Sequence, residues 1–98
     1  MSDGAPEVER EDRGSRRRYV IRAPEGEAEL TLSVLAPGRV AAEHTFVPPA
    51  LRGRGLAGAL LGALLDDARA EGFVIVPHCS YVAAEARRHP DWAPLFAA

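Results

Sequence analysis

The chain has 98 residues and a formal net charge of −2, and this length suits one folded domain. Its 12 basic residues are outnumbered by 14 acidic ones. Small nucleic-acid-binding domains carry a basic excess, so we expect no nucleic-acid partner. The single cysteine, Cys79, excludes an internal disulfide and a redox pair of cysteines, and we expect no metal site.

The amino-terminal segment is charged and lacks the apolar core that a secretion signal needs. The longest apolar run, residues 56–65, is too short to cross a bilayer. We therefore expect a cytoplasmic protein without a membrane partner.

Residues 1–17 are rich in charge and poor in apolar side chains, which predicts a disordered tail. One domain is then expected over residues 18–98. It begins with strands at residues 18–23 and 27–35, where apolar and polar side chains alternate. Turn-forming proline and glycine residues follow each strand, so these strands are expected to pair as antiparallel neighbours.

A third strand is predicted at residues 39–47. Strict alternation would place His44 and Phe46 on one face of this strand and Glu43 on the other. Pro48 and Pro49 end the strand, because neither residue can donate a backbone hydrogen bond to a neighbouring strand.

The pattern then changes to a helical period over residues 56–70, where the leucines share one broad face. Gly72 suits the end of this helix. A short apolar strand at residues 73–76 and a second helix at residues 80–88 follow. The fold class is therefore predicted to be α+β, with a mixed sheet: an antiparallel three-strand meander plus a parallel strand after a crossover helix.

The loop before the first helix contains Arg52, Gly53, Arg54 and Gly55. The first N–H groups of a helix have no partner within the helix, and this end of the helix is electropositive. Glycines let an anion approach the backbone closely, and arginines add charge and bidentate hydrogen bonds. The loop is therefore predicted to hold a pyrophosphate rather than to be an ordinary solvated turn.

The spacing Gly53-x-Gly55-x-x-Gly58 also fits a dinucleotide-binding fingerprint. That site needs a carboxylate after the next strand, where this chain has Val76-Pro77-His78. The phosphate-binding pattern of nucleoside triphosphatases is absent from the sequence. A dinucleotide site remains a weaker hypothesis.

Arg52-x-x-Gly55-x-Ala57 resembles the acetyl-CoA signature of the GNAT superfamily. Two further segments are similar to small single-domain members of it: Pro77-x-Cys79-Ser80-Tyr81-Val82 and His89-Pro90-Asp91-Trp92. The resemblance covers about residues 19–96. It implies a truncated GNAT-like acyl-CoA N-acyltransferase fold that binds acetyl-CoA between the third and fourth strands.

The resemblance also implies where each part of the cofactor would bind. The pyrophosphate would lie on the backbone of Gly53, Arg54, Gly55, Leu56, Ala57 and Gly58, next to Arg52. The pantetheine would run along Phe46 and Val47. Larger relatives continue with elements that shape the acceptor site, so the acceptor site here is expected to be shallow, shared with a partner, or absent.

Acetyl transfer to an amine requires removal of the amine proton and protonation of the leaving thiolate. Glu43 and His44 are the candidate bases, although each could equally be a structural strand residue. Cys79 precedes a helix and could act as a nucleophile, but direct transfer is preferred. Tyr81 is the candidate proton donor to the thiolate and could equally belong to the core.

These observations predict an acetyl-CoA-dependent N-acetyltransferase that acts on an amine acceptor, such as the amine of a protein or peptide. The alternative is a non-catalytic module that binds CoA or acyl-CoA. The sequence fits a monomer or a homodimer equally well.

Overall fold

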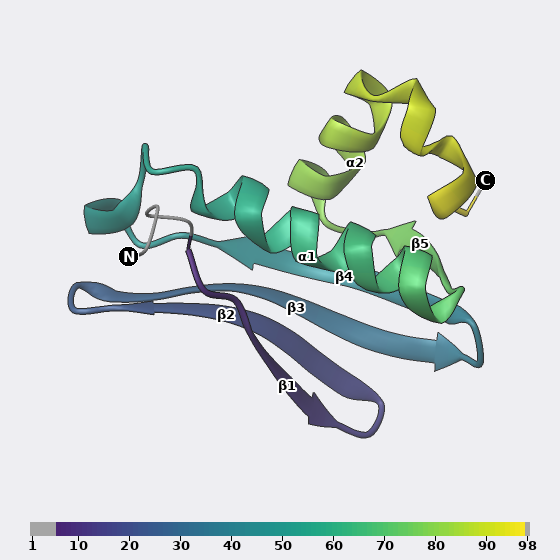
Figure 1. Cartoon of the computed structure of the whole chain (residues 1–98), viewed down its shortest axis with the longest axis horizontal. Coiled ribbons are helices and arrows are strands. Elements are labelled where there is room, and N and C mark those ends of the chain that lie inside the picture. Colours follow the sequence, from purple (N-terminus) through teal and green to yellow (C-terminus); the bar gives the residue numbers. More distant parts are fainter. Residues whose placement is uncertain (1–5, 98) are drawn as a thin grey trace.

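The computed structural model describes residues 6–97, and residues 1–5 and 98 lie outside this part (Figure 1). The elements follow one another in this order: β1 (Glu9–Arg13), β2 (Arg16–Ala23), β3 (Gly26–Ala36), β4 (Arg39–Phe46), η1 (Pro49–Leu51), α1 (Leu56–Glu71), β5 (Val74–Pro77), α2 (Ser80–Arg88) and η2 (Pro90–Leu95).

The five strands form one sheet in the order β1-β2-β3-β4-β5. Strands β1 to β4 pair antiparallel as a meander, and β5 joins β4 in parallel after the crossover through α1. The predicted α+β class and mixed sheet are confirmed, but the meander has four strands instead of three.

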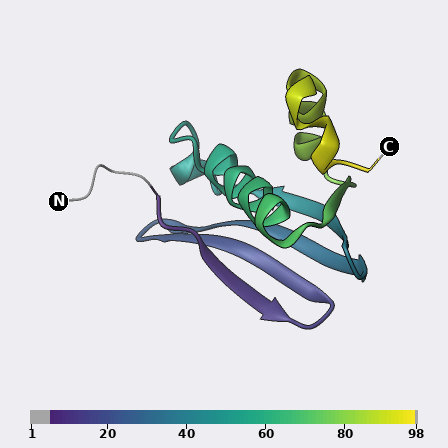
Figure 2. The ribbon, with the colours of Figure 1, turned by 45° about the vertical axis from the view of Figure 1, so that its right-hand side comes forward.

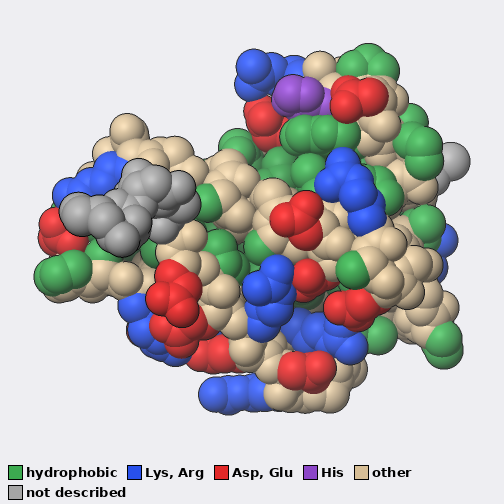
Figure 3. All heavy atoms as spheres, viewed as in Figure 1, with side chains coloured by type: hydrophobic (Ala, Val, Ile, Leu, Met, Phe, Trp, Pro, Cys, Tyr) green, Lys and Arg blue, Asp and Glu red, His purple; other side chains and the backbone are tan. Residues whose placement is uncertain are grey.

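The extra strand is β1, which lies in the segment predicted to be a disordered tail. That prediction is wrong for residues 9–17, and its part over residues 1–5 falls outside the described residues. Arg10 in β1 donates two hydrogen bonds to the Asp67 carboxylate in α1, at 2.8 and 3.0 Å, and the Tyr19 hydroxyl donates a third at 2.7 Å. Acidic and basic side chains gather over β1 and β2 (Figure 3). The strand is held by backbone pairing and ion pairs, which an apolar pattern does not reveal.

Helix α1 lies across one face of the sheet, and the other face of the strands carries no helix (Figure 2). The leucines of the predicted helical face are buried, with Leu60 and Leu64 at 0% exposure. They pack with Leu30 of β3 and Ile75 of β5 in the core cluster. Burial of each such side chain stabilises the fold by about 1.5–3 kcal/mol. Gly72 ends α1 in the left-handed region at φ 81°, as predicted.

Strand β4 contains a β-bulge. Thr31 of β3 pairs with His44 and the next residue, Leu32, pairs with Ala42, so Glu43 is an extra residue in β4. The bulge changes the alternation of faces. Strict alternation would also place His44 on the same face as Ala42, but Ala42 belongs to the core and His44 is exposed.

The carboxyl-terminal part begins with β5 and the predicted α2. The N-cap residue of α2 is Cys79, and Ser80, a residue type that often occupies this position, is instead the first residue of the helix. In η2, Trp92 stacks on His89 with ring centroids 3.9 Å apart. No helix in residues 6–97 is long and apolar enough to cross a membrane.

Candidate active site

The candidate site begins where β4 and β5 separate. Their parallel pairing runs from Arg39 and Val74 to Ala42 and Pro77. Beyond it, the chain turns away from β4, and the Cys79 N–H donates a last hydrogen bond to the Ala42 carbonyl at 2.8 Å. Strand β4 continues to Phe46 without β5 beside it. The bulge and the loss of a neighbouring strand therefore occur at the same place.

A hollow of about 270 Å³ lies at this separation. All four predicted catalytic residues line it, which are Glu43, His44, Cys79 and Tyr81, together with Thr45, His78 and Ser80. Strict alternation would place Glu43 and His44 on opposite faces of the strand, but the bulge lets both line this hollow. Their catalytic roles stay predictions.

Cys79 is buried in this hollow at 7% exposure. Its Sγ lies 3.2 Å from Thr45 Oγ1, where either atom can be the hydrogen-bond donor. Thr45 is not among the predicted site residues, because strict alternation places it on the face opposite His44. The hydroxyl fixes the position of the thiol at the head of α2.

Glu43 contacts His78, another residue that is not among the predicted site residues. His78 Nδ1 lies 3.1 Å from Glu43 Oε1. Burial raises the pKa of Glu43, but hydrogen bonds from His78 and Ser33 outweigh this effect, so its pKa lies below the ordinary value. Glu43 is therefore ionised at neutral pH and can accept a proton.

Tyr81 belongs to α2 and packs against the core. Burial raises its pKa, and the charge of Glu85 raises it further. The phenol is therefore protonated at neutral pH, which is the state that a proton donor needs.

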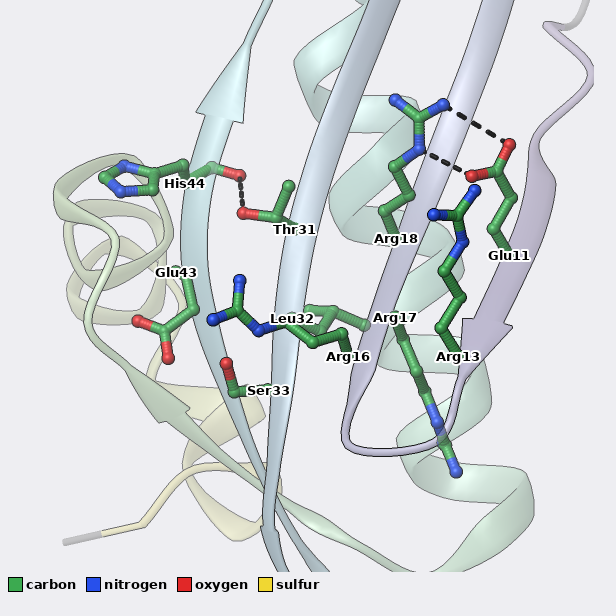
Figure 4. Close-up of a pocket in the computed structure, with 10 residues that line it drawn as sticks. All are labelled: Glu11, Arg13, Arg16, Arg17, Arg18, Thr31, Leu32, Ser33, Glu43 and His44. Atoms are coloured by element: carbon green, nitrogen blue, oxygen red, sulfur yellow. Dashed lines mark hydrogen bonds and ion pairs between the residues drawn. The ribbon is translucent and has the colours of Figure 1, made fainter.

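A larger hollow of about 620 Å³ lies on the sheet face opposite α1 (Figure 4). It shares Glu43 and His44 with the smaller hollow. The remaining residues that line it come from β1, β2 and β3: Glu11, Arg13, Arg16, Arg17, Arg18, Thr31, Leu32 and Ser33. The two candidate bases thus line both hollows.

The glycine loop has the backbone that an anion cradle requires. Gly53 and Gly55 have φ values of 81° and 74°, in the region that favours glycine, and open space lies where a side chain would point. Gly55 is the N-cap of α1, and no side chain caps this helix end. The loop amides and the first turn of α1 therefore fit a pyrophosphate.

The other predicted cofactor residues divide into three groups by exposure. Phe46 is 51% exposed and Gly58 is exposed, so both are accessible. Leu56 is buried in the core at 8% exposure, and only its backbone could meet a ligand. Val47 and Ala57 are half-buried.

The two loop arginines contact protein groups in this structure. Arg52 Nε donates to the Val47 carbonyl at 3.2 Å. Arg54 pairs with Glu25 of the β2–β3 turn at 3.1 Å, where both side chains are largely exposed. Exposed pairs of this kind are weak, so both guanidinium groups can turn to a phosphate.

Comparison with known proteins agrees with this geometry. A sequence model of the GCN5-related N-acetyl-transferase family matches residues 18–95. This chain belongs to that family.

Two solved structures are similar to the GCN5-related chain. One is the solution structure of a GCN5-like candidate N-acetyltransferase from Staphylococcus aureus, with a TM-score of 0.72, 20% identity, and coverage of 96% of this chain and 90% of that one. The other is the ribosomal-protein-alanine N-acetyltransferase from Brucella melitensis biovar Abortus 2308, with a TM-score of 0.57 and 20% identity. The match covers 86% of this chain and 65% of that one. Both share the GNAT-like fold, so the fold of this small single domain is the one predicted from its motifs.

Proposed function

We propose that this protein is an acetyl-CoA-dependent N-acetyltransferase that transfers acetyl to the amine of a protein or peptide. The observation that carries the proposal is the separation of β4 from β5 after Ala42. Two candidate bases, a thiol and a phenol line one hollow there, and the chain also has a glycine loop with the backbone of an anion cradle.

Acetyl-CoA would supply the acetyl group as a thioester, together with the thiol that leaves. Gly53, Gly55 and the first turn of α1 would hold its pyrophosphate through backbone N–H groups. Arg52 and Arg54 would add charge-assisted hydrogen bonds. The exposed edge of β4 at Phe46 would hold the pantetheine.

Glu43 and His44 would share the proton of the acceptor amine. Glu43 is ionised at neutral pH because His78 and Ser33 stabilise its carboxylate. A carboxylate with a lowered pKa is a weak base by itself. Exposed His44 lines the same hollow, and an imidazole is the side chain that most often serves as a general base, so we assign it the larger share of proton removal.

Tyr81 would donate the proton that the leaving thiolate needs, since its hydroxyl is protonated at neutral pH. Cys79 would help to position the acetyl group. Its burial and its contact with Thr45 support a positioning role more than attack as a free nucleophile.

The test combines calorimetry of CoA binding with CoA release in the presence of acetyl-CoA and an amine panel. His44→Ala should lower turnover by about 100-fold, the usual contribution of a general base, and leave CoA affinity unchanged. Cys79→Ala should lower turnover less if transfer is direct. The chain contains no lysine, so acetyl-lysine in the mixture must belong to the acceptor.

CoA binding without CoA release above the spontaneous rate, for any amine or peptide, would overturn the enzyme assignment and support the CoA-binding module. Tight NAD binding without CoA binding would support the dinucleotide site instead.

A further inference from the structure

The sheet face opposite α1 is built from rows of directly paired residues. One row runs from Arg13 in β1 through Arg16 and Ser33 to Ala41 in β4. The neighbouring row runs Glu11, Arg18, Thr31 and His44. Residues paired directly across antiparallel strands share a face, so the first row leads across the sheet to the bulge at Glu43.

Ion pairs fill one end of this face. Arg18 contacts Glu11 at 2.7 Å and Glu29 at 2.6 Å. Arg22 pairs with Glu9, Glu11 and Glu27. The charges of the two arginines are thus balanced by carboxylates of the same face.

At the other end of the face, two arginines lack such ion pairs in the part of the chain that the structure describes. Arg13 and Arg16 are exposed, and within residues 6–97 neither guanidinium forms an ion pair with a carboxylate. The two residues are paired directly across β1 and β2, where like charges destabilise a sheet. An anion bound between them would offset this repulsion.

Both arginines line the 620 Å³ hollow that also contains Glu43 and His44. Arg16 reaches across β3 with its guanidinium directed toward Glu43, whereas the Arg17 side chain extends away from Glu43 (Figure 4). Arg17 instead contacts Asp12 and Glu71. Of the two arginines without an ion pair among the described residues, Arg16 is therefore the one directed toward the candidate bases, whereas Arg13 extends toward Glu11 at the far side of the hollow (Figure 4).

We propose that this hollow is the acceptor site and that Arg13 and Arg16 select an acidic peptide, whose carboxylates they bind while its amine lies at Glu43 and His44. This assignment deepens the proposed function and rests on it. The guanidinium groups match carboxylates in shape and charge, and Thr31 and Ser33 add hydroxyls to the floor of the hollow.

The geometry limits where the acidic residues can stand in the peptide. The row from Arg13 to Ala41 spans three strand spacings, about 14 Å at roughly 4.8 Å each. An extended peptide covers about 3.3 Å per residue, so the carboxylates should lie about two to four residues from the reacting amine.

Charge favours a peptide over a nucleic acid. Glu11 and Glu43 line the same hollow, and the whole chain has a net charge of −2. A continuous phosphate backbone would pass close to these carboxylates, whereas a peptide can place two or three acidic side chains between them.

The experiment measures peptide binding to the full chain saturated with CoA, by titration calorimetry, and acetylation of the same peptides in a separate assay. One peptide carries a free α-amine and glutamates at its third to fifth positions, and its twin carries glutamines there. The acidic peptide should bind more tightly. Arg13→Gln and Arg16→Gln should each weaken its binding by about threefold, and together by about tenfold, with little effect on the glutamine twin.

Arg69→Gln is the matched control, since Arg69 is an exposed arginine of α1 on the other side of the sheet. It removes the same charge and should leave peptide binding unchanged. An equal loss in Arg69→Gln would mean that net charge alone attracts the peptide, which overturns the site.

Equal binding of the two peptides, or tighter binding of a single-stranded oligonucleotide, would also overturn the acidic-peptide site while leaving CoA binding intact. Failure of CoA binding would instead contradict the proposed function, and peptide binding to the free chain would still test Arg13 and Arg16 separately.

Discussion

The two halves of β4 have different neighbours in the sheet. The first half, residues 39–42, lies between β3 and β5, and Val40, Ala41 and Ala42 are at most 3% exposed. The second half, residues 43–46, has lost β5, and His44 and Phe46 are exposed. Small apolar side chains hold the first half in the sheet, and the reactive groups follow in the second, where backbone and side chains become accessible.

The largest expected effect is a difference in how much an introduced charge in each half of β4 lowers the stability of the protein. Ala42→Asp would bury a carboxylate in the core without a partner, and we expect a loss of about 3 kcal/mol or more in the free energy of unfolding. His44→Asp, two residues later, should change it by only about 0.5 kcal/mol. Urea unfolding followed by circular dichroism measures both. Similar losses would mean that the second half is also part of the stable core.

The next largest effect concerns the glycine loop. Arg52 of this loop donates a hydrogen bond to the carbonyl of Val47, the residue that follows the second half of β4. Gly55→Glu would place bulk and negative charge in the proposed cradle, and we expect CoA affinity to fall by about 100-fold, equivalent to about 2.7 kcal/mol.

Gly38→Glu provides a matched control in the β3–β4 turn. Gly38 has φ 76° and Gly55 has φ 74°, and neither has a neighbour within 4 Å of an added Cβ. Both variants should therefore lose about 1–2 kcal/mol of stability through the same backbone strain, but Gly38→Glu should retain CoA affinity. Loss of affinity in both would attribute it to stability and not to the cradle.

The sequence predicted the parts of the fold that follow from periodicity. Alternation in β3 and the leucine face of α1 match the buried residues, and Gly72 ends α1 as expected. Strand β1 was missed because its sequence, EREDR, has no apolar face. Its pairing depends on acidic and basic partners in β2 and α1, and a local pattern does not identify such partners.

The site was predicted by residue type and only partly by geometry. Glu43, His44, Cys79 and Tyr81 do line one hollow. The bulge was missed because the residues after Glu43 continue to alternate in sequence, so the pattern gives no sign of an extra residue. The bulge exists only in the pairing of β4 with β3, and it is what brings Glu43 and His44 to the same place.

The smallest expected effect tests whether the ionised Glu43 stabilises the second half of β4. Because its pKa is lowered in the folded state, ionised Glu43 stabilises the protein above the pKa of the unfolded chain, and this contribution is lost as pH falls through the lower folded pKa. The wild-type protein should exceed Glu43→Gln in stability at pH 7 by less than about 1 kcal/mol, since the pair is partly exposed. The difference in stability should become smaller in acid.

His78→Ala should remove most of this difference, because His78 Nδ1 lies 3.1 Å from the Glu43 carboxylate. A difference in stability that persists unchanged at low pH would assign the effect to packing of Glu43 and not to its charge. Packing would then stabilise the second half of β4, as it stabilises the first half.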